Sequence, residues 1–442
     1  MWLHIGIDDT DSPQGGCTTY VAVRIIEGLL GMGCEFTDYP NLLRLNPNVP
    51  WKTRGNGAVC LRIKVDAELE GEVRSTVIGE VEERAEFNCE NTNPGIVFHS
   101  GPIPEAFIRF SDRVVGSVVK IEDAMRLVDS YGASAVGYKN MRGVIGALAA
   151  VGGLQTGDHT YELLTYREPE NWGKSRRLDG ASVRAMDREL GDQTFNNVDP
   201  ESGRVLIAPH GPDPVLYGVR GETPEAVHSA STIVEAGEPV ERWTIFRSNQ
   251  GTDAHLRRVD KLSDLRPYHP AVVDGVIVEA PRTIQGGHVI FGLADDSCEI
   301  DCAAYEPTGS FRDVVRGLIV GDRLRAHGGV RAAETGTRCT LNLEKLETLE
   351  LGREILLKNP DCPECGGGME SMGRGKGFRC RSCGHRDQTI KKKEVELERE
   401  LEPGLYIPPP KAQRHLTKPT TRYGREKKEP APEVMYEPWH WP

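Results

Sequence analysis

Four cysteines near the C-terminal end constrain this chain most, because their spacing is typical of a metal site. Cys362 and Cys365 form one Cys-x-x-Cys pair, and Cys380 and Cys383 form a second, with 14 residues between the pairs. Two such knuckles bring four thiolates around one tetrahedral Zn²⁺. Four thiolates leave no open coordination position, so we expect a structural zinc ribbon at residues 358–390. Four free thiols or a redox pair are the alternatives.

The rest of the composition indicates a large chain in a reducing compartment. At roughly 150 residues per domain, 442 residues suggest about three domains. The total of 11 cysteines is odd, and seven of them are scattered, which does not suit a disulfide framework. No apolar run reaches the ~18–20 residues of a membrane span, and the N-terminus does not resemble a signal peptide. We expect a cytoplasmic protein without a membrane partner.

Charge is distributed unevenly. Residues 351–442 hold 18 Lys and Arg against 14 Asp and Glu, whereas residues 1–350 hold 36 against 52. An acidic body with a basic C-terminal arm is therefore expected. The arm's cations would contact phosphates of a nucleic acid, although a solvated charged face is the alternative. In and beside the ribbon they are Arg374, Lys376, Arg379, Arg381, Arg386 and Lys391 to Lys393.

An acidic glycine turn lies between a strand expected at residues 3–7 and a helix expected at 18–30. Its carboxylates are Asp8, Asp9 and Asp11. Three carboxylates this close need a counter-cation, and Mg²⁺ with nucleotide phosphates is the usual one. Gly15 and Gly16 before the helix would offer N–H groups to phosphates. A surface turn with a helix cap explains the pattern equally well.

Four further segments carry polar groups suited to ligands. Lys52 and Arg54 in the loop 45–57 suit phosphate or RNA contact, and the segment 139–143 has the same character. The segments 194–199 and 208–221 place an aromatic residue and two acids before a strand, where a small cation could bind. Ordinary structured loops are the alternative for all four.

The remaining pattern predicts two α+β units, a barrel and a tail. Residues 119–250 show helices at 121–130, 144–151 and 224–236, and strands at 160–166, 204–208, 214–219 and 242–246. A split βαβ sheet is expected there, with an uncertain boundary to the first unit. Five strands with a helix after the third over 268–350 suit an OB-fold, or a generic β-barrel. A charged helix is expected at 388–401, before a basic, Pro-rich tail.

The order of these blocks resembles one family closely, the archaeal tRNA 2-agmatinylcytidine (agmatidine) synthetases. The matching stretches are GIDDTDSPQGGCTT at 6–19, LNPNVPWKTRGNGA at 45–58, APHGPDPVLYGVRGE at 208–222, the ribbon and YIPPPKAQRHLTKP at 406–419. The resemblance covers essentially the whole chain. It implies a multidomain α+β protein with a kinase-like α/β N-terminal domain (1–118), a ferredoxin-like agmatine-binding domain (119–250), an OB-fold (268–350), a zinc ribbon (358–390) and a basic tail (391–442).

The resemblance also implies a reaction. Agmatine would be joined to C2 of the wobble cytidine of the isoleucine tRNA with a CAU anticodon, with ATP going to AMP and two phosphates. Phosphorylation of the cytosine O2 would supply a leaving group for the agmatine amine to displace. The implied ligands are ATP, Mg²⁺ and Zn²⁺, and the partners are that tRNA and agmatine, with no obligatory protein partner evident.

The family's roles map onto particular residues. Asp8, Asp9 and Asp11 receive catalytic and metal duties, with Asp8 and Asp11 as Mg²⁺ ligands. Thr18 best matches the family's functional threonine, although Thr19 is adjacent. The remaining assignments are Gly15, Gly16, Lys52 and Arg54 to ATP phosphates, Asp199 to catalysis, and Asp112 and Asp213 to agmatine.

Two other functions fit parts of the sequence. A single-stranded nucleic-acid-binding protein without catalysis would explain residues 268–442 but would leave Asp8, Asp9 and Asp11 without a role. A small-molecule kinase with an RNA-binding accessory end would transfer phosphate without tRNA. ATP turnover that depends on Asp8 separates the first alternative from the enzyme, and deletion of the barrel and ribbon tests the second.

Overall fold

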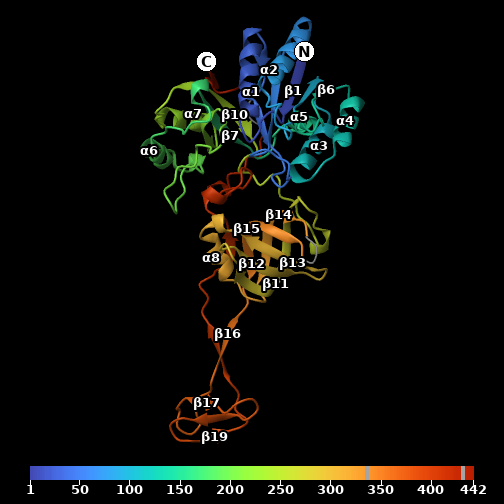
Figure 1. The fold of residues 1–442 in the computed structure, drawn as a ribbon. Helices are drawn as coiled ribbons and strands as arrows, with labels where there is room; N and C mark the ends of the chain where they lie inside the picture. Colours follow the sequence, from blue (N-terminus) through green and yellow to red (C-terminus); the bar gives the residue numbers. More distant parts are fainter. Residues whose placement is uncertain (334–337, 430–433) are drawn as a thin grey trace.

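The protein is described here by a computed structural model that covers residues 1–333, 338–429 and 434–442. The ranges 268–350 and 391–442, expected as an OB-fold and a tail, each include four residues outside that description. A two-lobed body, a barrel and a small ribbon follow one another along the long axis (Figure 1). No described helix is long and apolar enough to cross a membrane.

One mixed sheet of 11 strands runs through the body, in the order β6-β5-β1-β4-β3-β10-β7-β9-β8, with β2 paired to β4 and β22 to β10. The parallel pair of β3 and β10 joins its two halves. The strands are β1 (Trp2–Asp8), β2 (Glu35–Phe36), β3 (Asn41–Arg44), β4 (Gly57–Lys64), β5 (Gly95–Ser100), β6 (Ser134–Gly137), β7 (Thr160–Arg167), β8 (Thr194–Phe195), β9 (Val215–Gly221), β10 (Val240–Ser248) and β22 (His440–Trp441).

Helices cover both faces of the first half. The apolar residues of α1 and α2 pack with those of β1 in one cluster. The apolar residues of α3, α4 and α5 form a second cluster. These helices are α1 (Thr18–Gly31), α2 (Glu70–Arg84), α3 (Glu105–Gly116), α4 (Ile121–Ser130) and α5 (Gly143–Gly152). The helices expected at 121–130 and 144–151 form, and they pack with the first half of the sheet.

Glycines let α5 approach the sheet closely. A Cβ atom at Gly6 would overlap the carbonyl of Ala147, and one at Gly95 would overlap the backbone of Val144. Only glycine permits such an approach of helix and strand backbones. Since α5 is also buried along nearly its whole length, its position against β1 is fixed. This contact places the N-terminal end of α5 beside Asp8, the last residue of β1.

The second half of the sheet follows the order β7-α6-β8-β9-α7-β10, with α6 (Gly180–Leu190) and α7 (Pro224–Ile233) packed on β9. Helix α6 was not expected. The strand expected at 204–208 was wrong, because this stretch is a loop with a single bridge between Val198 and Val205. Turns lie on both sides of this stretch, so it does not pair with a neighbouring strand over more than one residue.

The barrel contains five strands that close through pairing of β13 with β15. Helix α8 (Phe311–Arg316) lies between the third and fourth strands, as expected. The strands are β11 (Pro270–Thr283), β12 (Val289–Ala294), β13 (Glu299–Ala304), β14 (Arg323–Arg331) and β15 (Thr340–Glu350), and β21 (Gly404–Tyr406) adds to β15.

A two-stranded stem carries the ribbon away from the barrel (Figure 1). It pairs β16 (Glu354–Lys358) with β20 (Lys393–Leu397). The helix expected at 388–401 was therefore wrong. Alternation over Lys393–Leu397, with Val395 and Leu397 less exposed than their neighbours, has the period of a strand, and pairing with β16 overrides helix propensity. The ribbon holds β17 (Met369–Ser371), β18 (Phe378–Cys380) and β19 (Arg386–Asp387).

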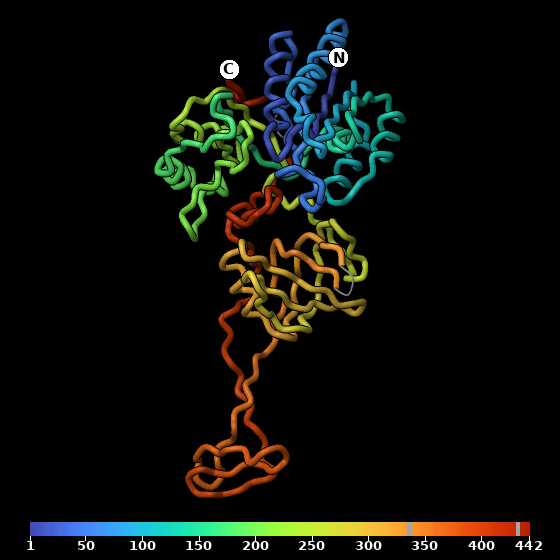
Figure 2. Tube along the Cα trace, in the orientation of Figure 1, coloured from blue at the N-terminus to red at the C-terminus, as the bar shows by residue number. Residues whose placement is uncertain are grey.

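After the ribbon the chain returns to the body. Residues 407–429, named the return segment here, cross between barrel and body (Figure 2). Arg422 is 1% exposed and anchors this segment through Asp158 at 2.8 Å and Glu222 at 2.6 Å. The chain then ends at β22 on the body sheet, opposite Trp243 of β10. In the sequence, the ribbon therefore lies between the barrel and the return segment, and both of these contact the body.

Candidate active site

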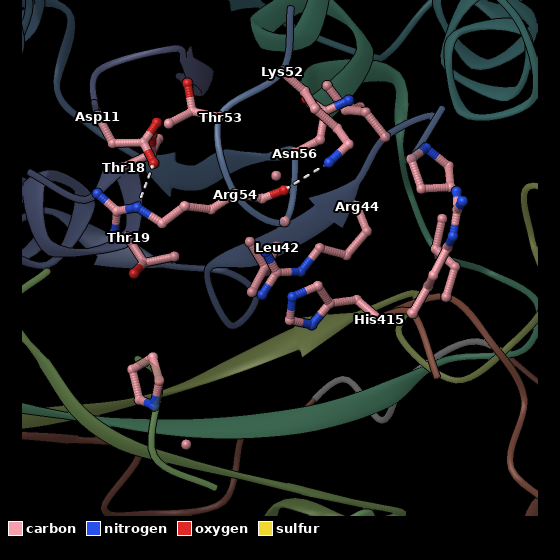
Figure 3. A pocket seen from close by; sticks show the side chains of 18 of the residues that line it. Asp11, Thr18, Thr19, Leu42, Arg44, Lys52, Thr53, Arg54, Asn56 and His415 are labelled. Carbon is pink, nitrogen blue, oxygen red and sulfur yellow. Dashed lines mark hydrogen bonds and ion pairs between the residues drawn. The ribbon is translucent and has the colours of Figure 1, made fainter. Parts of the chain in front are cut away.

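A cavity of about 910 Å³ opens where the two halves of the body meet the return segment. Its lining includes the acidic turn with the start of α1, the loop 45–57, and the segment 204–215 of the second half. The return segment closes one wall through His415 and its neighbours. Figure 3 shows side chains from the acidic turn, the loop and the return segment pointing toward one space.

Asp8, Asp9 and Asp11 all line the cavity, as expected from their spacing. Burial raises the pKa of each carboxyl, and the charge of Asp9 raises that of Asp8 further. Burial raises the pKa of Asp11 to about 6. Asp9, at φ 59°, points its carboxylate to Arg142, with Oδ2 2.8 Å from Nη2. Two arginines, Arg142 beside Asp9 and Arg54 beside Asp11, face the three carboxylates, and Arg54 is shared with Asp213, so the donor set suits a divalent cation.

Gly146 leaves the space that Asp8 occupies. A Cβ atom at this position in α5 would overlap Oδ2 of Asp8. The close packing of α5 on β1 therefore brings a helix backbone against the carboxylate without a side chain between them. Any residue larger than glycine would displace this carboxylate.

Thr18 and Thr19 begin α1 and line the cavity. The hydroxyl of Thr10 donates a hydrogen bond to Oγ1 of Thr18 at 3.0 Å, which orients the Thr18 hydroxyl beside the acidic turn. Gly15 and Gly16 precede the helix, and the cavity lining among the described residues does not include them. Their carbonyls instead accept hydrogen bonds from Arg54 at 2.7 and 2.8 Å.

Arg54 binds backbone and side-chain groups of the protein itself. Its Nη2 donates to three carbonyls of the acidic turn, those of Ser12, Gly15 and Gly16. Its Nε lies 3.6 Å from Oδ2 of Asp11, and its Nη1 lies 3.3 Å from Oδ2 of Asp213. The guanidinium thus holds the turn to the second half of the body, and its expected phosphate contact stays a prediction.

Lys52 projects into the cavity from the same loop. Its Nζ donates to the carbonyl of Arg54 at 3.1 Å (Figure 3). Burial lowers the pKa of Lys52, and the nearby charge of Arg414 lowers it further. A polyphosphate would offset this unfavourable placement of two cations.

A buried cluster of charged groups in the cavity was missed by the sequence analysis. Glu162 of β7 is flanked by Arg220 at 3.0 Å and Arg44 at 3.5 Å. Gln250 donates to Oε2 of Glu162, the oxygen that also faces Arg44, and His415 contacts both Gln250 and Arg220 at 3.1 and 2.8 Å. Burial lowers the pKa of His415 well below its usual value, as do the surrounding cations. These groups come from five separate segments, so no local motif marked them.

The other predicted acids lie in three different places. Asp213 lines the cavity between Arg54 and Arg176, and one of its oxygens is buried without a hydrogen-bond donor. Asp199 is fully buried outside the described lining, with Lys411 at 3.3 Å. Asp112 is exposed on α3, paired with Arg257 at 2.6 Å beside a second, shallower depression. The structure therefore brings Asp213 alone of the three into the cavity.

The four ribbon cysteines converge as predicted. Their Sγ atoms all lie within 4.8 Å of one another, at 3.6 Å for Cys362 and Cys383 and 3.5 Å for Cys365 and Cys380. Thiolates bound at about 2.3 Å to a tetrahedral ion lie roughly 3.8 Å apart, so this cluster fits Zn²⁺. The N–H groups of Ser382 and Cys383 donate to Cys380 Sγ and favour its thiolate.

An acid-lined cavity beside a barrel and a four-cysteine ribbon defines a class of protein, the multidomain enzymes that act on nucleic acid. Three family descriptions match the chain: the TiaS TCKD domain over residues 4–81, the TiaS FLD domain over 141–255 and the TiaS C-terminal zinc ribbon domain over 359–401.

Similar proteins cover nearly the whole chain. The isoleucine-tRNA 2-agmatinylcytidine synthetase TiaS of Methanosarcina mazei is 44% identical over 95% of this chain and 97% of its own length, and that of Methanocaldococcus jannaschii is 43% identical over 95% and 98%. The crystal structure of TiaS in complex with its isoleucine tRNA and ATP, 41% identical, matches 96% of this chain and 97% of its own with a TM-score of 0.87. This chain belongs to the TiaS family of isoleucine-tRNA 2-agmatinylcytidine synthetases, and the resemblance found in the sequence is confirmed.

Proposed function

We propose that this protein joins agmatine to C2 of the wobble cytidine of the minor isoleucine tRNA, whose anticodon is CAU, at the expense of ATP. The observation that carries the proposal is the convergence of Asp8, Asp9, Asp11 and Thr18 in one cavity, in a chain of this family. A crystal structure of a relative, 39% identical with a TM-score of 0.84, holds TiaS with its isoleucine tRNA, AMPCPP and agmatine and covers 96% of this chain.

The chemistry needs an activated cytosine. Phosphoryl transfer from ATP to the cytosine O2 breaks a P–O bond of the nucleotide and forms one to O2. The primary amine of agmatine then attacks C2, the C2–O2 bond breaks and phosphate leaves, and the attacking nitrogen loses one proton and keeps the other. The overall products, AMP and two phosphates, require one further phosphate to be released from the nucleotide to water.

The acidic turn would hold the metal of this reaction. Asp8 and Asp11 are the proposed Mg²⁺ ligands, with Asp9 beside them, because their buried carboxylates lack sufficient positive charge around them. Mg²⁺ would neutralise charge on the polyphosphate during transfer. Thr18, at the positively polarised end of α1, would face the same phosphates, and Lys52 would add a cation from the loop 45–57.

Agmatine is a dication, so its site needs carboxylates. Asp213 fits this role, because it lines the cavity and one of its oxygens has no donor. Asp199 and Asp112 stay candidates at a greater distance. The Oδ2 atom of Asp213, which lies 3.3 Å from Nη1 of Arg54 but accepts no hydrogen bond, would accept from the guanidinium or the amine and give up part of its ion pair with Arg54.

We infer the finer fold names from connectivity. The order β7-α6-β8-β9-α7-β10 with strand order β10-β7-β9-β8 supports a ferredoxin-like unit, and the five-stranded barrel with α8 after its third strand supports an OB-fold. A kinase-like unit would then comprise the strands and helices up to α5. On this division the first two units meet after α5, rather than at residue 118.

Incorporation of labelled agmatine tests the function. Zinc-loaded protein is incubated with a CAU transcript of the isoleucine tRNA, with and without ATP. We expect ATP-dependent label at the wobble cytidine, no label with Asp8→Asn, and unchanged label with the control Asp129→Asn on the exposed side of α4. A folded protein that binds the transcript without incorporating agmatine would contradict the proposal.

A further inference from the structure

Trp51 exposes its indole to solvent at the cavity, and this indole has no role in the proposed reaction. Its side chain belongs to the cavity lining, yet the residue is 39% exposed. No aromatic ring or side-chain cation in the described part of the chain stacks on this indole, whereas Trp2, Trp172 and Trp439 each have such a partner. An exposed indole face with no ring or cation stacked on it is open to the ring of a ligand.

The loop that carries Trp51 is held from three directions. Asn46 donates to the carbonyl of Tyr268, at the entrance to the barrel, at 2.9 Å. Asn48 contacts Arg414 of the return segment. Asn91, on the body, donates to the carbonyl of Trp51 itself at 2.8 Å. The backbone that carries the indole is therefore held where body, barrel and return segment meet.

The same contacts connect Trp51 to the acidic turn. Arg142 donates to the carbonyl and side-chain oxygens of Asn91 at 2.6 and 3.1 Å, and the same guanidinium forms the ion pair with Asp9. Lys52, the next residue in the chain, points into the cavity. An aromatic face flanked by cations at an acid and phosphate site has the composition of a nucleobase stacking platform.

We propose that Trp51 stacks on a nucleobase at the mouth of this cavity. The inference rests on the proposed function and names a contact for its substrates. Every base has a π-face, and stacking on an aromatic side chain holds a base after it has left its own stack. Two sources can supply the base, the anticodon nucleotide that reacts and the adenine of ATP.

Variants of Trp51 in the full, zinc-loaded chain test the platform. Trp51→Leu keeps apolar volume but removes the π-face, whereas Trp51→Phe keeps a ring. Trp2→Leu is the matched control, since Trp2 is 49% exposed at the start of β1 and lies outside the described lining. Filter binding is measured with the CAU transcript, with the same transcript lacking the wobble base, and with a non-hydrolysable ATP analogue.

For a stacked anticodon base, we expect Trp51→Leu to weaken binding of the intact transcript roughly five- to 150-fold, as loss of one stacked base should. Trp51→Phe should recover most of that loss, and the variant and wild type should bind the abasic transcript alike. Weakened binding of the ATP analogue with unchanged transcript binding assigns the same platform to adenine.

Two results would overturn the platform. The first is transcript and analogue affinities of Trp51→Leu that stay within twofold of wild type. The second is an equal loss on the intact and abasic transcripts, with ATP analogue binding unchanged. Agmatine incorporation by wild type is measured in parallel. Its failure would refute the proposed function, whereas these binding comparisons would still be readable.

Discussion

Arg54 and Asp213 join the two halves of the body across the cavity, with Nη1 and Oδ2 3.3 Å apart. The same guanidinium binds three carbonyls of the acidic turn, so the metal-type carboxylates and the second half of the sheet share one positioning residue. Arg54 has a φ of 42°, which a residue adopts only where its surroundings compensate for the strain.

Replacement of Arg54 should therefore disorganise the turn. We expect Arg54→Met to lower kcat/KM for agmatine incorporation roughly 100-fold, because a displacement of about 1 Å at a reacting centre has this effect. Arg54→Lys should recover little, since an ammonium cannot reach three carbonyls and two carboxylates together. Steady-state kinetics check this, with Arg109→Met on the exposed face of α3 as control. An Arg54→Lys enzyme with normal kinetics would contradict the positioning role.

Gly146 gives a steric test of Asp8. Gly146→Ala places a methyl group where Oδ2 of Asp8 lies, so the carboxylate must move and ATP turnover with tRNA should fall by roughly 100-fold or more. Gly79→Ala is the matched control, because Gly79 also lies in a helix, and a Cβ there would have open space. That control should keep its activity and gain about 0.5–1 kcal/mol of stability. Equal activity of both variants would show that Asp8 tolerates displacement.

The sequence predicts a site well where its members are neighbours in the chain. Asp8, Asp9 and Asp11 share one turn, and the ribbon cysteines share one spacing rule, so residue chemistry alone indicated their convergence. Glu162 and His415 are different. They come together because β7 and the return segment meet in three dimensions, and no local pattern encodes that contact.

In the C-terminal arm, local helix propensity led to a wrong prediction. In the body, the signal for a helix was overlooked. The Glu- and Lys-rich stretch 388–401 favours a helix in isolation, but pairing with β16 decides its conformation. Helix α6 did have a signal, since Asp179 caps it through the N–H groups of Ala181 and Ser182. The helix was overlooked although this cap and its buried residues Ser182, Val183 and Met186 mark it in the sequence.

Zinc removal should unfold the ribbon while the rest of the protein stays folded. The described ribbon connects to the barrel through the stem, so a chelator should unfold residues 358–390 while the thermal transition of the body persists. Transcript affinity should fall and lose part of its salt dependence as the arm's cations disperse. Metal analysis, calorimetry and binding at several salt concentrations check this. Cys380→Ser should reproduce the effect and Cys89→Ser should not; an unchanged affinity after complete zinc loss would exclude the ribbon from RNA binding.

Arg422 should be the anchor of the return segment. Arg422→Met leaves Asp158 and Glu222 without their buried guanidinium. The free energy of unfolding should fall by less than the ~3–5 kcal/mol expected when a buried charge loses its partner entirely, because Lys418 and Lys427 remain beside the two acids. Hydrogen exchange over residues 407–429 should rise sharply, and activity should fall with it. Arg425→Met, at an exposed ion pair, should change little. Unchanged exchange in Arg422→Met would move the anchor elsewhere.

Acid should weaken the junction of barrel and return segment through His327. Burial lowers the pKa of His327 to about 4, and the charge of Lys345 lowers it further. Between pH 6.5 and about 4 the unfolded chain binds a proton that the folded one does not, so the free energy of unfolding falls as the pH is lowered through this window. At pH 5 the loss from this residue is about 2 kcal/mol. Urea unfolding of the barrel at pH 7 and pH 5 should therefore show a smaller difference for His327→Leu than for wild type, whereas His210→Gln, at an exposed position, should leave the difference unchanged. If His327→Leu and wild type lose stability equally, the acid sensitivity of the barrel comes from other groups.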